Sequence, residues 1–224
     1  ICKLVVMLLL AFTAGVQAQL VTYPESLNPG MPHNDDYTVR VRIPGGEWKD
    51  LFEYNVQVDM DNVQNASMVQ FDMGSAVEVM VKKNNGSVRE VTIRPLSKGI
   101  EYKQIQNAIL FTLEKPQYLS IEFDGDRLHN LHLFANPLET EKYDKETKGI
   151  MYFGPGVHRP KDLPNNQIRI PGNTTVYLAP GAVVKAKLLV DKAENVRIIG
   201  RGILDHPIRG IEVTDSKNVL IDGI

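Results

Sequence analysis

The chain has 224 residues, of which 43% are hydrophobic and 23% are charged, and its formal net charge is −2. These values exclude a disordered tail and a multi-span membrane protein, and they fit one or two globular domains. The 25 Lys and Arg residues nearly balance the 27 Asp and Glu residues, so the chain lacks the basic excess of proteins that bind nucleic acids or anionic membranes. We therefore expect neither nucleic acid nor a membrane surface as its partner.

Residues 1–18 have the pattern of a secretory signal peptide. Lys3 precedes an apolar run, and the small residues Val16 and Ala18 occupy the −3 and −1 positions of a cleavage site. The run is shorter than the roughly 20 apolar residues of a transmembrane helix, so we expect no membrane span. Secretion, or export to the periplasm, is the expected localisation. Cys2 is the only cysteine, so a mature chain without this segment has neither disulfides nor cysteine-bound metals.

Residues 19–135 show the alternation of apolar and polar residues that is typical of half-buried β-strands. In the segment 77–82, for example, three valines alternate with Glu78, Met80 and Lys82. Further strands are predicted at 37–43, 54–59, 68–72, 88–94, 109–113, 117–124 and 131–134. A turn is expected at Asn85 and Gly86, between two of these strands. This number and spacing of strands is typical of an antiparallel β-sandwich of immunoglobulin-like size.

The pattern changes twice after the predicted sandwich. Residues 136–149 alternate acids and bases and contain few apolar residues, so we interpret them as a linker. Residues 150–224 contain short strands and a repeat, because the sequence Asn-Val-x-Ile-x-Gly at 195–200 recurs 23 positions later at 218–223. A period in the low twenties predicts a parallel β-helix. Asn195 and Asn218 are expected to support its corners and to form a ladder between coils.

Three segments of this repeat region resemble the opening coils of clan-N glycoside hydrolases. They are YFGPGVHRP at 152–160, IPGNTTVYLAPGAVVKAKL at 170–188 and NVRIIGRGILD at 195–205. The clan contains the polygalacturonases of family 28 and the dextranases and isopullulanases of family 49. The preceding sandwich favours family 49, in which an immunoglobulin-like domain is joined to a right-handed β-helix. His206 departs from the pattern, because many relatives have Gly there.

The resemblance implies an all-β fold: an N-terminal immunoglobulin-like β-sandwich followed by the first coils of a right-handed parallel β-helix. It also implies that the chain is the N-terminal part of a secreted polysaccharide hydrolase whose substrate is a pectic or an α-glucan polysaccharide. Inverting hydrolysis needs one carboxylic acid and one carboxylate base. By resemblance these Asp residues lie on middle coils beyond Ile224. We therefore expect no catalytic residue, cofactor site or metal site in this chain, and no hydrolase activity of residues 19–224 alone.

Two other functions remain open at this point. A polysaccharide lyase on the same architecture would need a calcium site and a basic residue for β-elimination, and the motifs above fit it less well. A non-enzymatic adhesin or glycan-binding protein is also compatible, because a fold does not determine a function.

Two pairs of carboxylates within the chain are candidates for a catalytic pair and a calcium loop, and we interpret both as turn residues. Asp205 and Asp222 end apolar strands of adjacent coils and resemble a paired-carboxylate site, but Asp is favoured at turns for its own backbone hydrogen bonds. Asp59 and Asp61 resemble the start of a calcium loop. Val63, however, occupies the third ligand position and no Gly follows, so we expect a surface turn.

Histidines and aromatic residues are the remaining candidates. His129 and His132 are three positions apart, which places them on opposite faces of a strand and argues against metal binding. Trp48, Tyr54 and Tyr152 have rings able to stack on sugars, although packing within the protein is the expected role of most such rings. Asn-x-Ser/Thr sequons, which matter only in a glycosylating host, begin at Asn65, Asn85 and Asn173.

Overall fold

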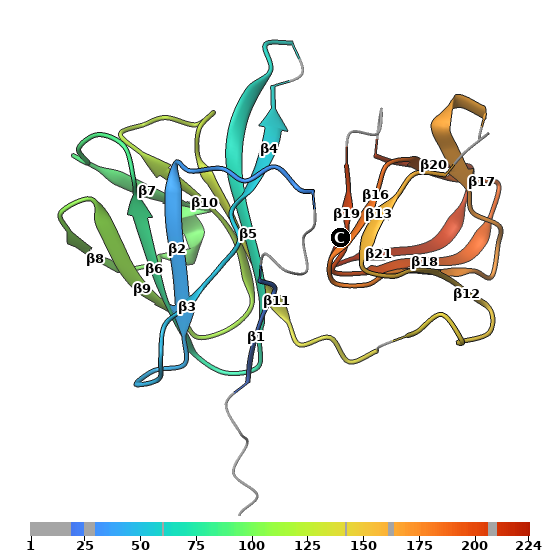
Figure 1. The fold of residues 1–224 in the computed structure, drawn as a ribbon, viewed down its shortest axis with the longest axis horizontal. Helices are drawn as coiled ribbons and strands as arrows, with labels where there is room; N and C mark the ends of the chain where they lie inside the picture. The colour runs from blue at the N-terminus through green and yellow to red at the C-terminus, as the bar shows by residue number, and fades with distance from the viewer. Residues whose placement is uncertain (1–18, 25–29, 60, 142, 161–163, 206–209) are drawn as a thin grey trace, which may run out of the picture.

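The computed structural model describes residues 19–24, 30–59, 61–141, 143–160, 164–205 and 210–224. Within these ranges the chain forms two all-β regions that lie side by side, a sandwich and a stack of parallel coils (Figure 1). None of the described residues forms a helix that is long and apolar enough to cross a membrane. The predicted signal peptide and His206 lie outside the described residues. The predicted all-β fold class, a sandwich followed by the start of a β-helix, is confirmed.

The sandwich consists of two sheets. The first has the order β1 (Leu20–Thr22), β5 (Gln64–Met73), β11 (Leu131–Pro137), β10 (Gln117–Phe123), β7 (Val91–Arg94), and β4 (Tyr54–Val58) also pairs with β5. The second has the order β3 (Lys49–Asp50), β2 (Tyr37–Arg42), β6 (Val77–Lys83), β9 (Ala108–Leu113), β8 (Tyr102–Ile105). A 3₁₀ turn, η2 (Leu96–Lys98), follows β7.

The sandwich core lies between the two sheets. Val39 and Val79 from the second sheet, and Phe71 and Ile121 from the first, are fully buried in one cluster. Most alternate positions of these strands are polar, with Met80 as an exception, because successive side chains point to opposite faces of a sheet. The alternation in the sequence therefore identifies which side chains form the core.

Two features of the sandwich differ from the expectation. The segment around Asn85 and Gly86 does not join a hairpin: β6 pairs with β2 and β9, whereas β7 pairs with β10 in the other sheet. The sandwich is also not entirely antiparallel, because β5 and β11 pair in parallel. The two strands are distant in sequence, so no short turn forces them into opposite directions. The short strands β1, β3 and β8 were not predicted.

The second region is a stack of coils with three parallel sheets. The sheets are β12 (Ile150–Phe153), β15 (Thr175–Leu178), β18 (Glu194–Gly200) and β21 (Lys217–Asp222); β13 (Gly156–His158), β16 (Ala182–Val184) and β19 (Ile203–Leu204); and β14 (Gln167–Arg169), β17 (Lys187–Asp191) and β20 (Ile211–Thr214). A 3₁₀ turn, η3 (Pro164–Asn166), precedes β14. Successive coils stack in register, as shown by the row Met151, Val176, Ile198 and Ile221. This stacking of successive repeats defines a parallel β-helix.

The predicted asparagine ladder is present and has one more member than expected. Asn195 and Asn218 have φ angles of 55° and 53°, and the Asn218 side chain donates to the Asn195 side chain at 2.5 Å. Asn195 donates in turn to Asn173 at 2.9 Å, and Asn173 also has a positive φ of 56°. Asn tolerates the left-handed conformation better than other residues with side chains. The ladder therefore fixes the same corner on three successive coils.

Candidate functional site

A buried ion pair joins the sandwich to the β-helix. Arg201, directly after β18, donates from Nε to Asp72 on β5 at 2.7 Å, and the two side chains are only 4% and 2% exposed. The same guanidinium donates to the backbone carbonyls of Gly200 and Pro137. Gln70 on β5 donates to the backbone carbonyl of Arg201 at 3.1 Å. The end of β5 and the corner of the third coil are thus held together by several hydrogen bonds.

The segment that was interpreted as a linker contacts the outer face of the β-helix through side chains. Glu141 accepts two hydrogen bonds from the Arg197 guanidinium at 2.8 and 2.6 Å. The Tyr143 hydroxyl donates to the same carboxylate at 2.5 Å, and the Tyr143 ring meets Tyr177 edge to face at 5.3 Å. The linker is therefore attached to the second and third coils by polar and aromatic contacts.

A row of side chains on the outer face of the first β-helix sheet ends in two tyrosines. Tyr152 on β12, Tyr177 on β15 and Ile199 on β18 are in register. The rings of Tyr152 and Tyr177 are stacked, with centroids 6.0 Å apart and an interplanar angle of 21°. Because β12 is the edge strand of its sheet, Tyr152 is the last ring of this row.

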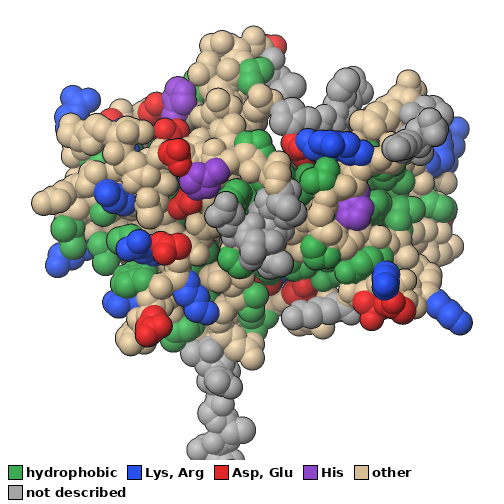
Figure 2. Space-filling model, viewed as in Figure 1, with side chains coloured by type: hydrophobic (Ala, Val, Ile, Leu, Met, Phe, Trp, Pro, Cys, Tyr) green, Lys and Arg blue, Asp and Glu red, His purple; other side chains and the backbone are tan. Residues whose placement is uncertain are grey.

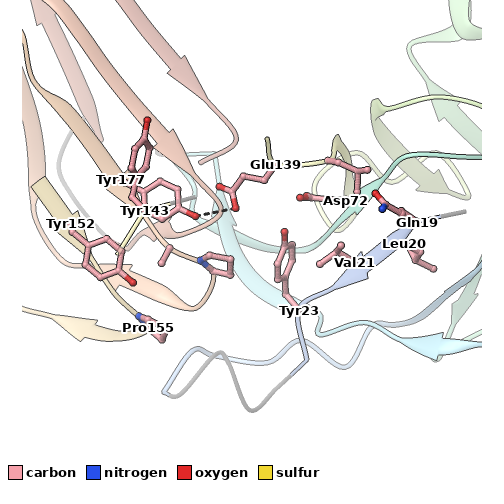
Figure 3. Close-up of a pocket in the computed structure, with 13 residues that line it drawn as sticks. Gln19, Leu20, Val21, Tyr23, Asp72, Glu139, Tyr143, Tyr152, Pro155 and Tyr177 are labelled. Carbon is pink, nitrogen blue, oxygen red and sulfur yellow. Dashed lines mark hydrogen bonds between the residues drawn. The ribbon is translucent and has the colours of Figure 1, made fainter. Parts of the chain in front are cut away.

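These tyrosines line a cleft between the two regions with a volume of about 780 Å³. In Figure 3, Tyr23, Asp72 and the residues near β1 form one wall, and Tyr143, Tyr152 and Tyr177 form the other. Glu139 lies between the two walls and accepts a hydrogen bond from the Tyr177 hydroxyl at 3.0 Å. The remaining described lining residues are Gln19, Leu20, Val21, Leu138, Pro155, Ala179 and Pro180.

Two tyrosines that line the cleft, and Glu141 beside it, have shifted pKa values. Burial raises the pKa of the Tyr23 hydroxyl, and the charge of Asp72 and a hydrogen bond to it raise it further. Burial and the charge of Glu139 likewise raise the pKa of Tyr177. Hydrogen bonds from Arg197, and secondarily from Tyr143, lower the pKa of Glu141 to about 2. At neutral pH the cleft therefore presents neutral tyrosine hydroxyls.

The arrangement suits binding better than acid–base chemistry. Asp72 is paired with the permanently charged Arg201, and Glu141 is held ionised by Arg197. The pKa of Glu141 is lowered, whereas a general acid requires a raised pKa. Tyrosine rings, by contrast, combine an apolar face with a polar hydroxyl.

The carboxylate pairs considered in the sequence do not form sites. Asp205 is buried and ion-paired with Lys185 of the preceding coil. Asp222 was expected at a turn but is the last residue of β21, in register with Ile199 of the neighbouring strand β18, and this sheet is not the one that contains β19, which Asp205 follows. Asp59 accepts backbone hydrogen bonds from Asp61 and Asn62, which is the expected surface turn. Among the described residues, no group of three or more His, Cys, Asp and Glu is arranged to hold a metal ion.

The two histidines lie in different local environments. His129 precedes β11 and pairs with Asp126 at 2.9 Å. His132 lies within β11, and burial lowers its pKa. His129 therefore has an acidic partner in Asp126, whereas His132 belongs to a strand of the sheet.

The aromatic candidates differ in burial and location, and the sequon residues lie on the surface. Tyr54 is buried at 1% exposure, and Trp48 packs against the guanidinium of Arg42 at 4.3 Å. Only Tyr152 of the three aromatic candidates lines the cleft. The three sequon residues Asn65, Asn85 and Asn173 are all exposed.

Charge is distributed evenly over the visible surface of the molecule. Acidic and basic side chains are interspersed on the face shown in Figure 2, and no extended basic patch appears there. This distribution agrees with the near-neutral composition and gives no footprint for a polyanion on that face.

The fold and the junction define an all-β protein in which a sandwich is docked onto a parallel β-helix. The structure is similar to that of Dex49A from Penicillium minioluteum, with a TM-score of 0.60 and 21% sequence identity. The match covers 78% of this chain and 46% of the Dex49A chain, so this chain spans less than half of that protein. No family model and no curated protein sequence matches the chain. The likeness establishes the fold.

Proposed function

We propose that this chain is the N-terminal part of a secreted glycoside hydrolase that cleaves polysaccharides. The observation that carries this proposal is the likeness to Dex49A, which extends over both the sandwich and the β-helix. The order of the two regions is the one that the family-49 resemblance implies. The substrate class is a pectic or an α-glucan polysaccharide, and the mechanism is inverting hydrolysis by a pair of carboxyl groups.

The catalytic pair belongs, in this proposal, to coils that follow Ile224. The chain matches only 46% of Dex49A, which leaves room for further coils. Within the described residues, Asp72 and Asp205 are each paired with a cation of the β-helix. Each of these two carboxylates therefore has a structural role in an ion pair.

The test is the activity of the longer secreted protein that contains residues 19–224. We expect it to release reducing ends from dextran, pullulan or polygalacturonate, and we expect a chain that ends at Ile224 to release none. Replacing paired Asp residues on the added coils by Asn should abolish the release. A complete β-helix without any Asp pair, or one that is inactive on all three polymers, contradicts the proposal.

The same experiment distinguishes a polysaccharide lyase from a hydrolase. A lyase produces an unsaturated uronide that absorbs in the ultraviolet, whereas a hydrolase does not. Absorbance that increases together with calcium-dependent cleavage of polygalacturonate would favour the lyase. N-terminal sequencing of the secreted protein tests the export proposal, because cleavage after Ala18 leaves Gln19 as the first residue.

A further inference from the structure

The outer face of the first sandwich sheet carries an exposed aromatic groove. Tyr118 on β10 and Phe134 on β11 are in register and meet edge to face, with ring centroids 5.5 Å apart. Tyr118 is 50% exposed, and Leu96 of η2, which lines the same groove, is 65% exposed. The groove has a volume of about 610 Å³, and its other lining residues are Arg94, Pro95, Leu119, Ser120 and His132. An exposed apolar surface of this kind marks an interaction site.

The coils of the β-helix follow the strand order of this same sheet, which is β1, β5, β11, β10, β7. The cleft described above places Tyr152 and Tyr177, on the first two coils, opposite the region of β1. Arg201 on the third coil binds Asp72 on β5 and the backbone carbonyl of Pro137 at the end of β11. Later coils thus meet the sandwich at later strands of the sheet.

The fourth coil continues this progression to β10. Gly223, which directly follows β21, lies against Arg201 of the preceding coil, because a Cβ atom at Gly223 would overlap the Arg201 guanidinium. Asp222, the last residue of β21, lies near Tyr118: burial raises the pKa of the Tyr118 hydroxyl, and the charge of Asp222 raises it further. The corner of the fourth coil is therefore next to the aromatic groove.

Equal spacing allows this match to extend over further coils. Neighbouring strands of a sheet lie about 4.8 Å apart, and stacked coils of a β-helix have the same spacing because their strands are hydrogen-bonded in the same way. One added coil therefore moves the contact by about one sandwich strand. The strands that follow the present contacts in the sheet order are β10 and β7, and both contribute to the groove.

The side of the β-helix that faces the sandwich is the sheet of β13, β16 and β19 (Figure 1). Its outward row consists of three apolar residues in register, Val157, Val183 and Ile203. Val183 is only 1% exposed, although it is Ala182 and Val184, on either side of it, that pack in the helix core. A Cβ atom at Gly30, which precedes β2, would lie 4.0 Å from the Val157 side chain. The outward row is therefore an apolar contact surface.

We propose that the groove at Tyr118 and Phe134 is the docking surface for the coil that continues from Ile224, which contacts it through an apolar outward side chain. This inference rests on the proposed function, because that function places further coils after Ile224. The repeat of 23 positions puts the equivalent of Ile203 at the second position after Ile224, and we expect an apolar residue there. The sandwich then supports the β-helix beyond the four coils of this chain and fixes the direction in which coils are added.

Hydroxyl-radical footprinting of the longer secreted protein tests this contact within one sample. Tyr102 on β8 is the internal reference, because it is 38% exposed and belongs to the other sheet of the sandwich. An uncovered Tyr118, at 50% exposure, would be oxidised at least as fast as Tyr102. Under a docked coil we expect Tyr118 to be oxidised several-fold more slowly than Tyr102. Equal rates overturn the inference.

A charge placed in the groove provides a second measurement. In Tyr118→Lys the docked coil would deprive the ammonium group of water, so we expect the melting temperature of the longer protein to fall by several degrees. Ile105→Lys is the matched control, because Ile105 is 48% exposed on β8, and it should leave the melting temperature nearly unchanged. Equally small shifts in the two variants, or a charged residue at the second position after Ile224, contradict the docked coil.

Other occupants of the groove give different results. Protection of Tyr118 that increases with protein concentration would identify a second copy of the protein, and protection that requires an added oligosaccharide would identify a sugar. Either result overturns the inference.

Hydrolysis by the longer protein is measured independently. An active hydrolase in which Tyr118 is oxidised as fast as Tyr102 removes the docked coil and leaves the proposed function standing. An inactive protein in which Tyr118 is protected removes the hydrolase and keeps the docked coil.

Discussion

The sandwich and the β-helix bury similar side chains by different means. In the sandwich, Ile121 is fully buried because a second sheet covers the face of the first. In the β-helix, Ile198 is fully buried, whereas Ile221 in the same row on the next coil is 45% exposed. The two β-helix residues differ in their neighbours and not in their type. Burial in the β-helix therefore depends on the coils above and below.

The junction between the two regions differs from both cores because it is polar. A guanidinium, a carboxylate and several backbone carbonyls meet there, and Arg201 and Asp72 are both buried. Such a contact fixes one orientation, because each hydrogen bond requires a particular geometry. It also makes the junction sensitive to the loss of either partner.

The largest expected effect comes from breaking this junction. Arg201→Met leaves Asp72 buried without its cation, and we expect the free energy of unfolding to fall by about 3–5 kcal/mol. The double variant Asp72→Leu with Arg201→Met removes both charges and should recover most of that loss. Urea denaturation of the three proteins measures both values. A loss below about 1 kcal/mol in the single variant, which is typical of exposed pairs, would show that the junction does not rely on this contact.

The second prediction compares two positions in one row of the β-helix. Ile198→Ala removes a fully buried side chain and should cost about 2–5 kcal/mol. Ile221→Ala should cost less than about half of this, because the side chain is 45% exposed in the 224-residue chain. Urea denaturation again provides the values.

The same pair of variants tests whether further coils cover Ile221. In the longer protein we expect Ile221→Ala to become as costly as Ile198→Ala, because a following coil would bury the row. Equal and small costs of Ile221→Ala in both proteins would mean that no coil packs on β21.

A smaller effect is expected in the asparagine ladder. Asn195→Ala places a residue with a Cβ atom at a φ of 55° and removes the hydrogen bonds to both neighbouring coils, which should cost about 1–2 kcal/mol. Asn195→Gly is the control, because Gly adopts this conformation freely but also lacks the side chain. The difference between the two variants in thermal unfolding isolates the cost of the conformation. If both variants melt at the same temperature, the hydrogen bonds carry the whole effect.

Local patterns in the sequence predicted most of the fold. Alternation identified most strands of the sandwich, and the repeat at 195–200 and 218–223 predicted the stacked coils and their asparagine corners. These features depend on residues that are close in sequence or separated by one fixed period. Asn173 escaped the same reasoning because its neighbourhood, Asn-Thr-Thr, was interpreted as a glycosylation sequon.

The junction and the cleft were not predictable in the same way. Asp72 and Arg201 are 129 positions apart. Asp72 belongs to no motif, and Arg201 lies in the segment 195–205, which was interpreted only as a structural element. Tyr177 lies within the segment VYLAPG, which was interpreted only as a structural element. The alignment of Tyr152 with Tyr177 on neighbouring strands could in principle have been predicted, because both positions follow the repeat of the coils. The wall of the cleft that contains β1 could not have been predicted, because the strand β1 itself was not predicted.

The smallest expected effect concerns the linker and its dependence on pH. The pKa of Glu141 is lowered from 4.5 to about 2, first by hydrogen bonds from Arg197 and then by Tyr143. Because the folded pKa lies below the unfolded one, the contact stabilises the folded protein fully above about pH 4.5 and is lost as the pH falls towards 2. Glu141 is exposed, so we expect local release of the linker and little change in global unfolding.

Nuclear magnetic resonance separates this local release from acid unfolding. The side-chain signals of Arg197 and Tyr143 should titrate together with a midpoint well below 4.5, while signals from buried residues of the sandwich core stay constant. In Glu141→Gln the titration should disappear, since the amide does not ionise. A midpoint near 4.5 for Arg197 would mean that the linker is not held by this carboxylate. The β-helix would then be attached to the sandwich mainly through Arg201 and Asp72, and the wall of the cleft formed by Tyr143 would not be fixed.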